Sequence, residues 1–94
     1  MVVEITSPFD KTRDKLPFYE KIGVRELLLV DRDPWRLELY RLQDGQLTSV
    51  GQSTVDNAMT VSSEVVSMTF RLITGDPRPR IEIALRDGEK QWRV

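Results

Sequence analysis

A short apolar run, Leu27 to Val30, constrains the fold of this 94-residue chain more than any other segment. Glu26 precedes the run and Asp31 ends it, so the run has the length of a strand and is far too short to cross a membrane. Continuous apolar runs of this length are typical of strands that are buried on both faces. The sequence therefore predicts an interior strand here.

Residues 2–6 form a β-branched run that predicts an opening strand. Alternation places Val3 and Ile5 on one face of this strand and Glu4 on the other. A carboxylate within an apolar strand is disfavoured unless it faces solvent or has a partner. Glu4 is therefore either a solvent-facing residue of an edge strand or a residue with a functional role.

Residues 15–22 predict a helix that follows this strand. Asp14 is a good N-cap residue, and Pro17 is tolerated in the first turn because its missing N–H would be unpaired there anyway. Gly23 is expected to end the helix in a left-handed conformation. Lys15 begins this helix, where its ammonium is expected either to approach the end of the Glu4 strand or simply to face solvent.

The rest of the chain predicts a series of short strands. Asp44-Gly45 is a strong hairpin signal between two such segments, and Asp87-Gly88 is a second. The segments are residues 26–30, 35–42, 47–51, 59–61, 68–73, 81–85 and 91–94. This order predicts an α+β fold with a largely antiparallel sheet, in which the first strand–helix–strand unit forms a right-handed parallel crossover. We expect one domain, with a core of residues 2–72 and a C-terminal hairpin extension at 73–94.

The chain contains neither cysteine nor histidine, which limits its chemistry. Thiolate nucleophiles, zinc thiolate sites and triads that depend on histidine are thereby excluded. Carboxylates, lysines, hydroxyls and a hard metal ion remain. The net charge of −1 gives no overall indication of a nucleic-acid partner. With no apolar span or signal peptide, a cytoplasmic protein without a membrane partner is expected.

Several other residues have a functional and a structural interpretation. Tyr19 lies four residues after Lys15, so both belong to one helical face, where the tyrosine ring is expected in the core with its hydroxyl at the rim. Trp35 and Trp92 are candidates for stacking on bases, although each lies in an alternating strand where packing is the usual role. A basic stretch is suited to phosphate contacts or to a solvated surface; it contains Lys11, Arg13, Lys15, Lys21 and Arg25.

An ordered series of short motifs resembles the Uma-type putative restriction endonuclease family, which is widespread in bacteria and belongs to the PD-(D/E)XK nuclease superfamily. The motifs are Val3-Glu4-Ile5-Thr6-Ser7-Pro8, Asp14-Lys15-Leu16-Pro17-Phe18-Tyr19, Ile22-Gly23-Val24-Arg25-Glu26-Leu27, Val30-Asp31, and Leu37-Glu38-Leu39-Tyr40-Arg41-Leu42 with Asp44-Gly45. The resemblance covers roughly residues 2–72. It implies a restriction-endonuclease-like core and metal-dependent hydrolysis of phosphodiesters in DNA, with Mg²⁺ or Mn²⁺ as the metal.

When the family's residue roles are transferred by position, the resemblance implies that Glu4 is an acidic metal ligand. Thr6 stands where the superfamily commonly has its lysine, and Lys15 matches a lysine that the family displaces to the following helix. The family's first catalytic aspartate lies on an upstream strand that this chain does not contain. We therefore expect an incomplete catalytic site and a domain that is inactive alone.

Two alternatives remain open at the level of sequence. The chain is either a non-catalytic binding module, in which an open sheet edge pairs two copies into a homodimer, or an unrelated scaffold domain with an incidental resemblance. DNA and a second copy of the chain are thus the two expected partners.

Overall fold

The computed structural model describes residues 1–6, 12–32, 34–88 and 90–94. The described residues form eight strands, one 3₁₀ helix and one short α-helix, so the α+β class is confirmed. In chain order the elements are β1 (Val2–Ile5), η1 (Thr12–Lys15), α1 (Leu16–Lys21), β2 (Glu26–Arg32), β3 (Trp35–Gln43), β4 (Gln46–Thr54), β5 (Val61–Ser62), β6 (Met68–Ile73), β7 (Arg80–Leu85) and β8 (Gln91–Arg93).

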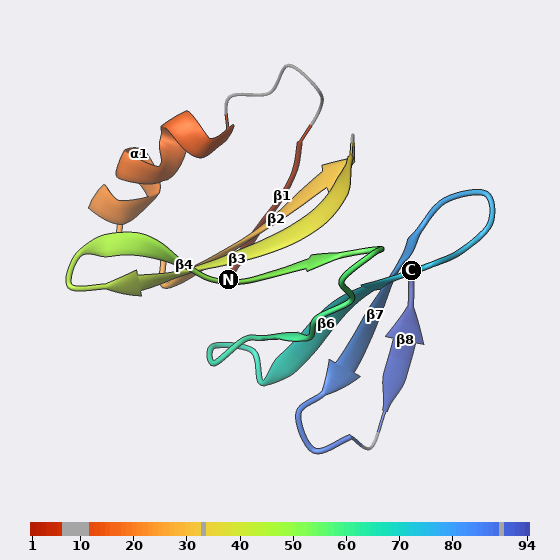
Figure 1. The fold of residues 1–94 in the computed structure, drawn as a ribbon. Helices are drawn as coiled ribbons and strands as arrows, with labels where there is room; N and C mark the ends of the chain where they lie inside the picture. Colours follow the sequence, from red (N-terminus) through yellow and green to blue (C-terminus); the bar gives the residue numbers. More distant parts are fainter. Residues whose placement is uncertain (7–11, 33, 89) are drawn as a thin grey trace.

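The strands form two four-stranded sheets (Figure 1). In the first sheet, with order β1-β2-β3-β4, β1 is parallel to β2 and the other neighbours are antiparallel. In the second sheet, with order β5-β6-β7-β8, all neighbours are antiparallel. The expectation of a single, largely antiparallel sheet is therefore wrong, because the segments after residue 60 assemble into a sheet of their own. The expected C-terminal hairpin forms within this second sheet, as β7 and β8.

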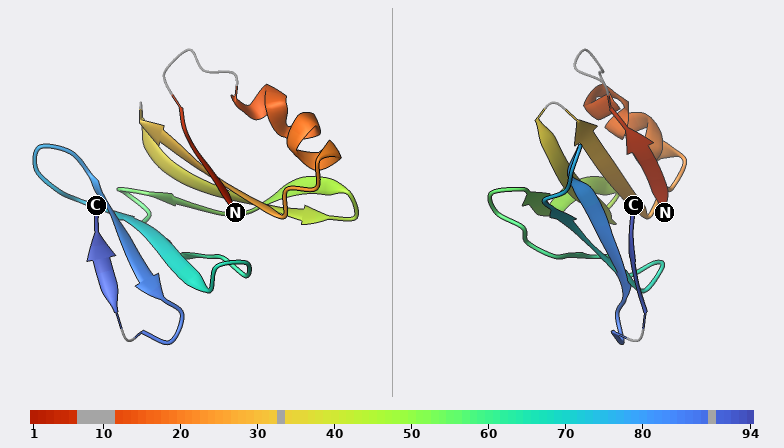
Figure 2. Two further views of the ribbon diagram at one scale, coloured as in Figure 1. Left: turned by 180° about the vertical axis from the view of Figure 1, so that it is seen from behind. Right: turned by 90° about the vertical axis from the view of Figure 1, so that its right-hand side faces the viewer.

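The first sheet is the middle layer of the fold, with α1 on one face and the second sheet on the other (Figures 1 and 2). The two faces bury separate apolar clusters. Under the helix lie Leu27, Leu29, Tyr40 and Leu47, with Val2, Leu16, Tyr19 and Leu42 packed around them. Between the sheets lie Leu28, Val30, Leu37, Leu39, Val61, Phe70 and Leu72.

This layering explains why a second sheet is needed. The strand predicted at residues 26–30 is buried throughout, and its leucines alternate between the two clusters. The six-residue helix α1 covers only one face, so the other apolar face requires a second layer. Phe70 and Leu72 supply that layer from β6. None of the helices in the described ranges is long and apolar enough to span a membrane.

The sequence prediction for the ends of α1 is confirmed at the C-terminus and is wrong at the N-terminus. Gly23 has φ +79°, and its N–H donates to the carbonyl of Glu20, so the expected left-handed helix end is confirmed. Asp14, however, is not the N-cap residue. It lies within η1, and Lys15 occupies the cap position without a side-chain capping bond. The 3₁₀ turn that precedes α1 displaces the aspartate from the cap.

The hairpin turn that joins β3 to β4 follows the prediction, with φ of 52° at Asp44 and 81° at Gly45. The return strand is longer than expected and extends to Thr54. The strand expected at residues 59–61 is reduced to Val61–Ser62.

Candidate functional site

Glu4 lies on β1 and shares a sheet face with Val2, which packs under α1. The side chain is half-buried, and its carboxylate accepts a hydrogen bond from the Tyr19 hydroxyl on α1. Glu4 therefore belongs to an edge strand, as one interpretation of the sequence held, but it faces the helix and has a partner there.

Lys15 lies at the N-cap of α1, and its side chain is exposed. Among the ion pairs of the described residues, none joins Lys15 to Glu4. Tyr19, which the sequence placed on the same helical face, contacts the carboxylate instead. The assignment of Glu4 and Lys15 as catalytic residues thus stays a prediction.

Two other carboxylates are buried on the same face of the first sheet, and one arginine joins them. Asp31 on β2 is 7% exposed and Glu38 on β3 is 5% exposed. Arg13 of η1 reaches both, with its Nη2 atom 2.9 Å from Asp31 Oδ2 and 2.8 Å from Glu38 Oε1. The guanidinium thereby balances two carboxylates that would otherwise repel each other in a poorly solvated site.

A β-bulge completes the hydrogen bonding of Glu38. The register of β3 and β4 shifts between Leu39 and Tyr40, because Val50 has no partner opposite it. As a result Ser49 and Gln52, three residues apart, both donate to Glu38 Oε2, at 2.9 and 2.6 Å. The Tyr40 hydroxyl donates to Oε1 at 2.8 Å.

Asp31 is satisfied in the same way. It accepts hydrogen bonds from the Thr6 hydroxyl at 2.6 Å and from Arg36 Nε at 3.0 Å, besides those from Arg13. Burial by itself would raise the pKa of Asp31, but Arg13, Thr6 and Arg36 outweigh this effect and lower the pKa to about 2. Both carboxylate oxygens of Asp31 therefore accept hydrogen bonds at neutral pH.

Glu38 responds to its surroundings in the same direction. Burial favours the protonated form, yet the hydrogen bonds from Arg13 and Gln52 hold the pKa of Glu38 below its usual range. The pKa of the Arg13 guanidinium is raised, chiefly by its hydrogen bond to Asp31. These three groups are charged and mutually satisfied, so none is poised to exchange a proton near neutral pH.

The arrangement does not fit a divalent metal. Magnesium and manganese require several oxygen ligands around one point. In the part of the chain that the structure describes, no group of three or more acidic residues is placed to hold an ion. Glu4 accepts the Tyr19 hydroxyl, and arginines neutralise Asp31 and Glu38. Metal binding by Glu4 therefore stays a prediction.

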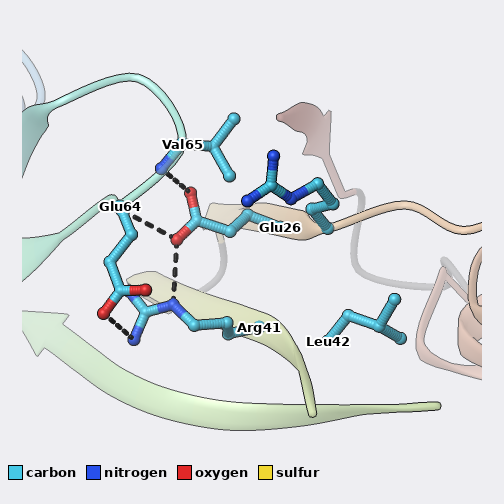
Figure 3. Close-up of a pocket in the computed structure, with 6 residues that line it drawn as sticks. Glu26, Arg41, Leu42, Glu64 and Val65 are labelled. Carbon is cyan, nitrogen blue, oxygen red and sulfur yellow. Dashed lines mark hydrogen bonds and ion pairs between the residues drawn. The ribbon is translucent and has the colours of Figure 1, made fainter. Parts of the chain in front are cut away.

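A further buried carboxylate joins the two sheets (Figure 3). Glu26 opens β2, is fully buried, and accepts hydrogen bonds from Arg41 Nε at 3.0 Å and from the Ser63 hydroxyl. The backbone N–H groups of Glu64 and Val65 also donate to it, at 3.0 and 3.2 Å. These donors lower the pKa of Glu26 against the opposing effect of burial. Glu26 thus anchors the turn between β5 and β6 of the second sheet to the first sheet.

Three residues named in the sequence analysis lie outside the described residues: Lys11, in the basic stretch, and Ser7 and Pro8, in the first motif. Of the remaining basic stretch, Arg13 is used in the buried cluster, whereas Lys15, Lys21 and Arg25 have exposed side chains. Trp92 on β8 is 44% exposed. Trp35 is half-buried at the start of β3 and packs against the cluster between the sheets.

Sequence reasoning missed the Arg13–Asp31–Glu38 cluster. A signal was present in Arg36, Glu38 and Tyr40, which alternate along a strand flanked by strands with buried leucines. Polar residues at the inward-facing positions of such a strand require partners. The identity of those partners depends on η1 and on the Val50 bulge, neither of which the pattern reveals.

Comparison with known proteins gives a match to a protein family. The family described as Uma2, putative restriction endonuclease, matches residues 1–74. No curated protein and no solved structure matches the chain. The matched residues include the whole first sheet, α1 and the strands β5 and β6, and they end before β7 and β8.

Proposed function

The chain belongs to the Uma2 family of putative restriction endonucleases, and from this premise we propose that it is a nuclease-type domain that does not cleave DNA by itself. The proposal includes a core of the PD-(D/E)XK type, in which Glu4 and Lys15 occupy the acid and lysine positions of the active site. The observation that carries it is the isolation of Glu4. Its carboxylate accepts a hydrogen bond from Tyr19, and the described residues form no group of three or more acidic side chains that could hold a metal ion.

The position of β1 supports this proposal. Among the described strands β1 pairs only with β2, so its outer edge is available to another strand. A strand bound there with an acidic residue level with Glu4 would supply the second oxygen ligand that a divalent ion needs. Lys15 lies at the start of α1 on the same side of the sheet, where its exposed ammonium would stabilise charge on a phosphate. Nuclease activity is thus expected only when another strand binds at the β1 edge and supplies the second acidic ligand.

Nicking of supercoiled plasmid DNA with Mg²⁺ or Mn²⁺ tests this proposal. The chain alone is expected to give no metal-dependent nicking. Glu4→Gln and Lys15→Ala are compared with matched controls, Glu64→Gln on an exposed turn and Lys21→Ala on α1. Metal-dependent nicking that both site variants abolish and both controls retain would contradict the inactivity and support the catalytic positions. Equal nicking in all variants would contradict the role of Glu4.

A second candidate function is homo-oligomerisation through the same edge. Val3 and Ile5 are 53% and 62% exposed, which is unusual for β-branched residues on a strand. Pairing of β1 from two copies would satisfy the open edge and cover these side chains. Multi-angle light scattering should then give a dimer mass that Ile5→Lys reduces to the monomer. Ile22→Lys, at a residue 60% exposed beside α1, should leave the dimer intact. A monomer at high concentration would refute this candidate.

A further inference from the structure

A groove between the two sheets is lined by residues at the end of β2, at the start of β3 and at the end of β4, and by Pro79 in the loop that joins β6 to β7. Its volume is about 550 Å³, which suits a ligand of nucleotide size. Its lining includes Arg32, Trp35, Arg36, Asp56 and Pro79. Pro79 lies beyond the part of the chain that matches the family, so the C-terminal sheet helps to build this groove.

We propose that this groove binds single-stranded nucleic acid, with one base stacked on Trp35 and the flanking phosphates held by arginines. The proposal does not depend on the proposed function, because it uses other residues and requires no cleavage.

The aromatic platform is Trp35. Its indole packs against the apolar cluster between the sheets and also lines the groove, so the ring is held in place before a ligand arrives. The Arg78 guanidinium carbon lies 6.0 Å from the centroid of the ring. For a base to stack on this face, the Arg78 guanidinium must move aside from the ring. The fixed indole is then a suitable surface, because every base presents a π-face and stacking needs no sequence-specific contact.

The charges around the platform favour a polyanion. Arg32 donates through Nε to the carbonyl of Thr6 at 3.2 Å, and Arg78 donates through Nη1 to the carbonyl of Pro79 at 3.0 Å. Neither arginine has a carboxylate partner within the ranges that the structure describes. Each guanidinium therefore keeps N–H donors that can bind phosphate oxygens. Arg36 contributes less, because Asp31 neutralises it.

Asp56 is the acidic residue on the described lining, and it opposes phosphate binding. It has an exposed side chain, so its removal is expected to disturb the fold little. This residue makes the proposal testable in both directions. Loss of Arg78 should weaken binding, whereas loss of the Asp56 charge should strengthen it.

Single strands are favoured over duplex because a base reaches a tryptophan face only when it is unstacked from its neighbours. The groove has room for one such base beside the ring, with Arg32 in its lining and Arg78 over the ring. A duplex offers its phosphates but no free base. Competition between the two forms therefore distinguishes stacking from simple charge attraction.

The test measures fluorescence anisotropy of a labelled oligothymidine of about twelve nucleotides, with EDTA present so that metal plays no part. Arg78→Ala is expected to weaken binding about tenfold and to reduce the salt dependence by about 0.7 in the slope of log K against log salt. Asp56→Asn is expected to strengthen binding about threefold. Arg86→Ala, the same loss of charge at the far end of β7, is the matched control and should change little.

Tryptophan fluorescence provides the second measurement. In the Trp92→Phe variant Trp35 is the remaining indole, and its emission should be quenched as the oligothymidine binds. Equal weakening by Arg78→Ala and Arg86→Ala would overturn the proposal, and so would unquenched Trp35 emission at saturating oligonucleotide. Equal competition by duplex of the same length would also overturn it, because it would reduce the interaction to charge alone.

Discussion

Replacement of Glu26 by glutamine tests whether one buried carboxylate holds the second sheet onto the first. The side chain is fully buried and accepts hydrogen bonds from Arg41, Ser63 and two backbone N–H groups. Glutamine has nearly the same shape but removes the charge and places an NH₂ group against a cluster of donors. Removal of one partner of a buried ion pair typically lowers the free energy of unfolding by about 3–5 kcal/mol.

We expect Glu26→Gln to lie at the lower end of that range, at about 3 kcal/mol, because Arg41 retains the Ser62 carbonyl and Glu64 as partners. For a domain of this size that corresponds to a fall of roughly 12–24 °C in the melting temperature. Urea unfolding followed by tryptophan emission measures the change. Glu64→Gln is the control, since its carboxylate is 67% exposed and 3.6 Å from Arg41. Its expected effect is below about 1 kcal/mol.

The pH dependence provides a second criterion for Glu26. Its pKa is lowered in the folded protein, so its contribution to stability is present above the unfolded pKa of about 4.3 and is lost as the pH falls through the folded pKa. The difference in stability between the wild type and Glu26→Gln should therefore be constant near neutral pH and shrink in acid. A difference below about 0.5 kcal/mol at pH 7, or one that does not change in acid, would refute the reasoning.

Three further changes have expected outcomes. Arg13→Met should destabilise the fold by about 2 kcal/mol in urea unfolding, since it leaves Asp31 and Glu38 buried without their shared cation. This value is below the cost usual for a buried ion pair because the Arg13 side chain is 36% exposed. Because the pKa of Asp31 is about 2 when folded, its stabilising effect should be lost between about pH 4 and pH 2, and Asp31→Asn should remove that part of an acid titration of stability. Gly75→Ala should lower the melting temperature, because an added Cβ would lie 2.6 Å from the Arg78 carbonyl oxygen.

Local features of the fold could be predicted because they depend on local chemistry. Gly23 and the Asp44-Gly45 pair adopt positive φ where few other residues do so readily, and the run at residues 26–30 is buried as its composition requires. The assignment of Asp14 as N-cap failed because the 3₁₀ turn before α1 has no distinct sequence signal. Such turns are selected by tertiary packing more than by propensity.

Long-range features could not be predicted in the same way. The partition of the strands into two sheets depends on which apolar faces meet, and alternation gives only the period of each strand. The partners of Glu38 come from three segments. Gln52 lies directly opposite Glu38, whereas Ser49 reaches the same face because of the bulge at Val50. Glu4 was identified as unusual from its strand, yet its contact with Tyr19 follows from the way α1 packs on this face of the first sheet.

Binding of Mn²⁺ to the isolated chain, followed by electron paramagnetic resonance, is the most direct test of the claim that the acidic site is incomplete. Because no group of three or more acidic residues in the described part of the chain is placed to hold an ion, we expect only weak binding, with a dissociation constant of about 1 mM or above. Tight stoichiometric binding, at micromolar Mn²⁺ and abolished by Glu4→Gln, would contradict the account.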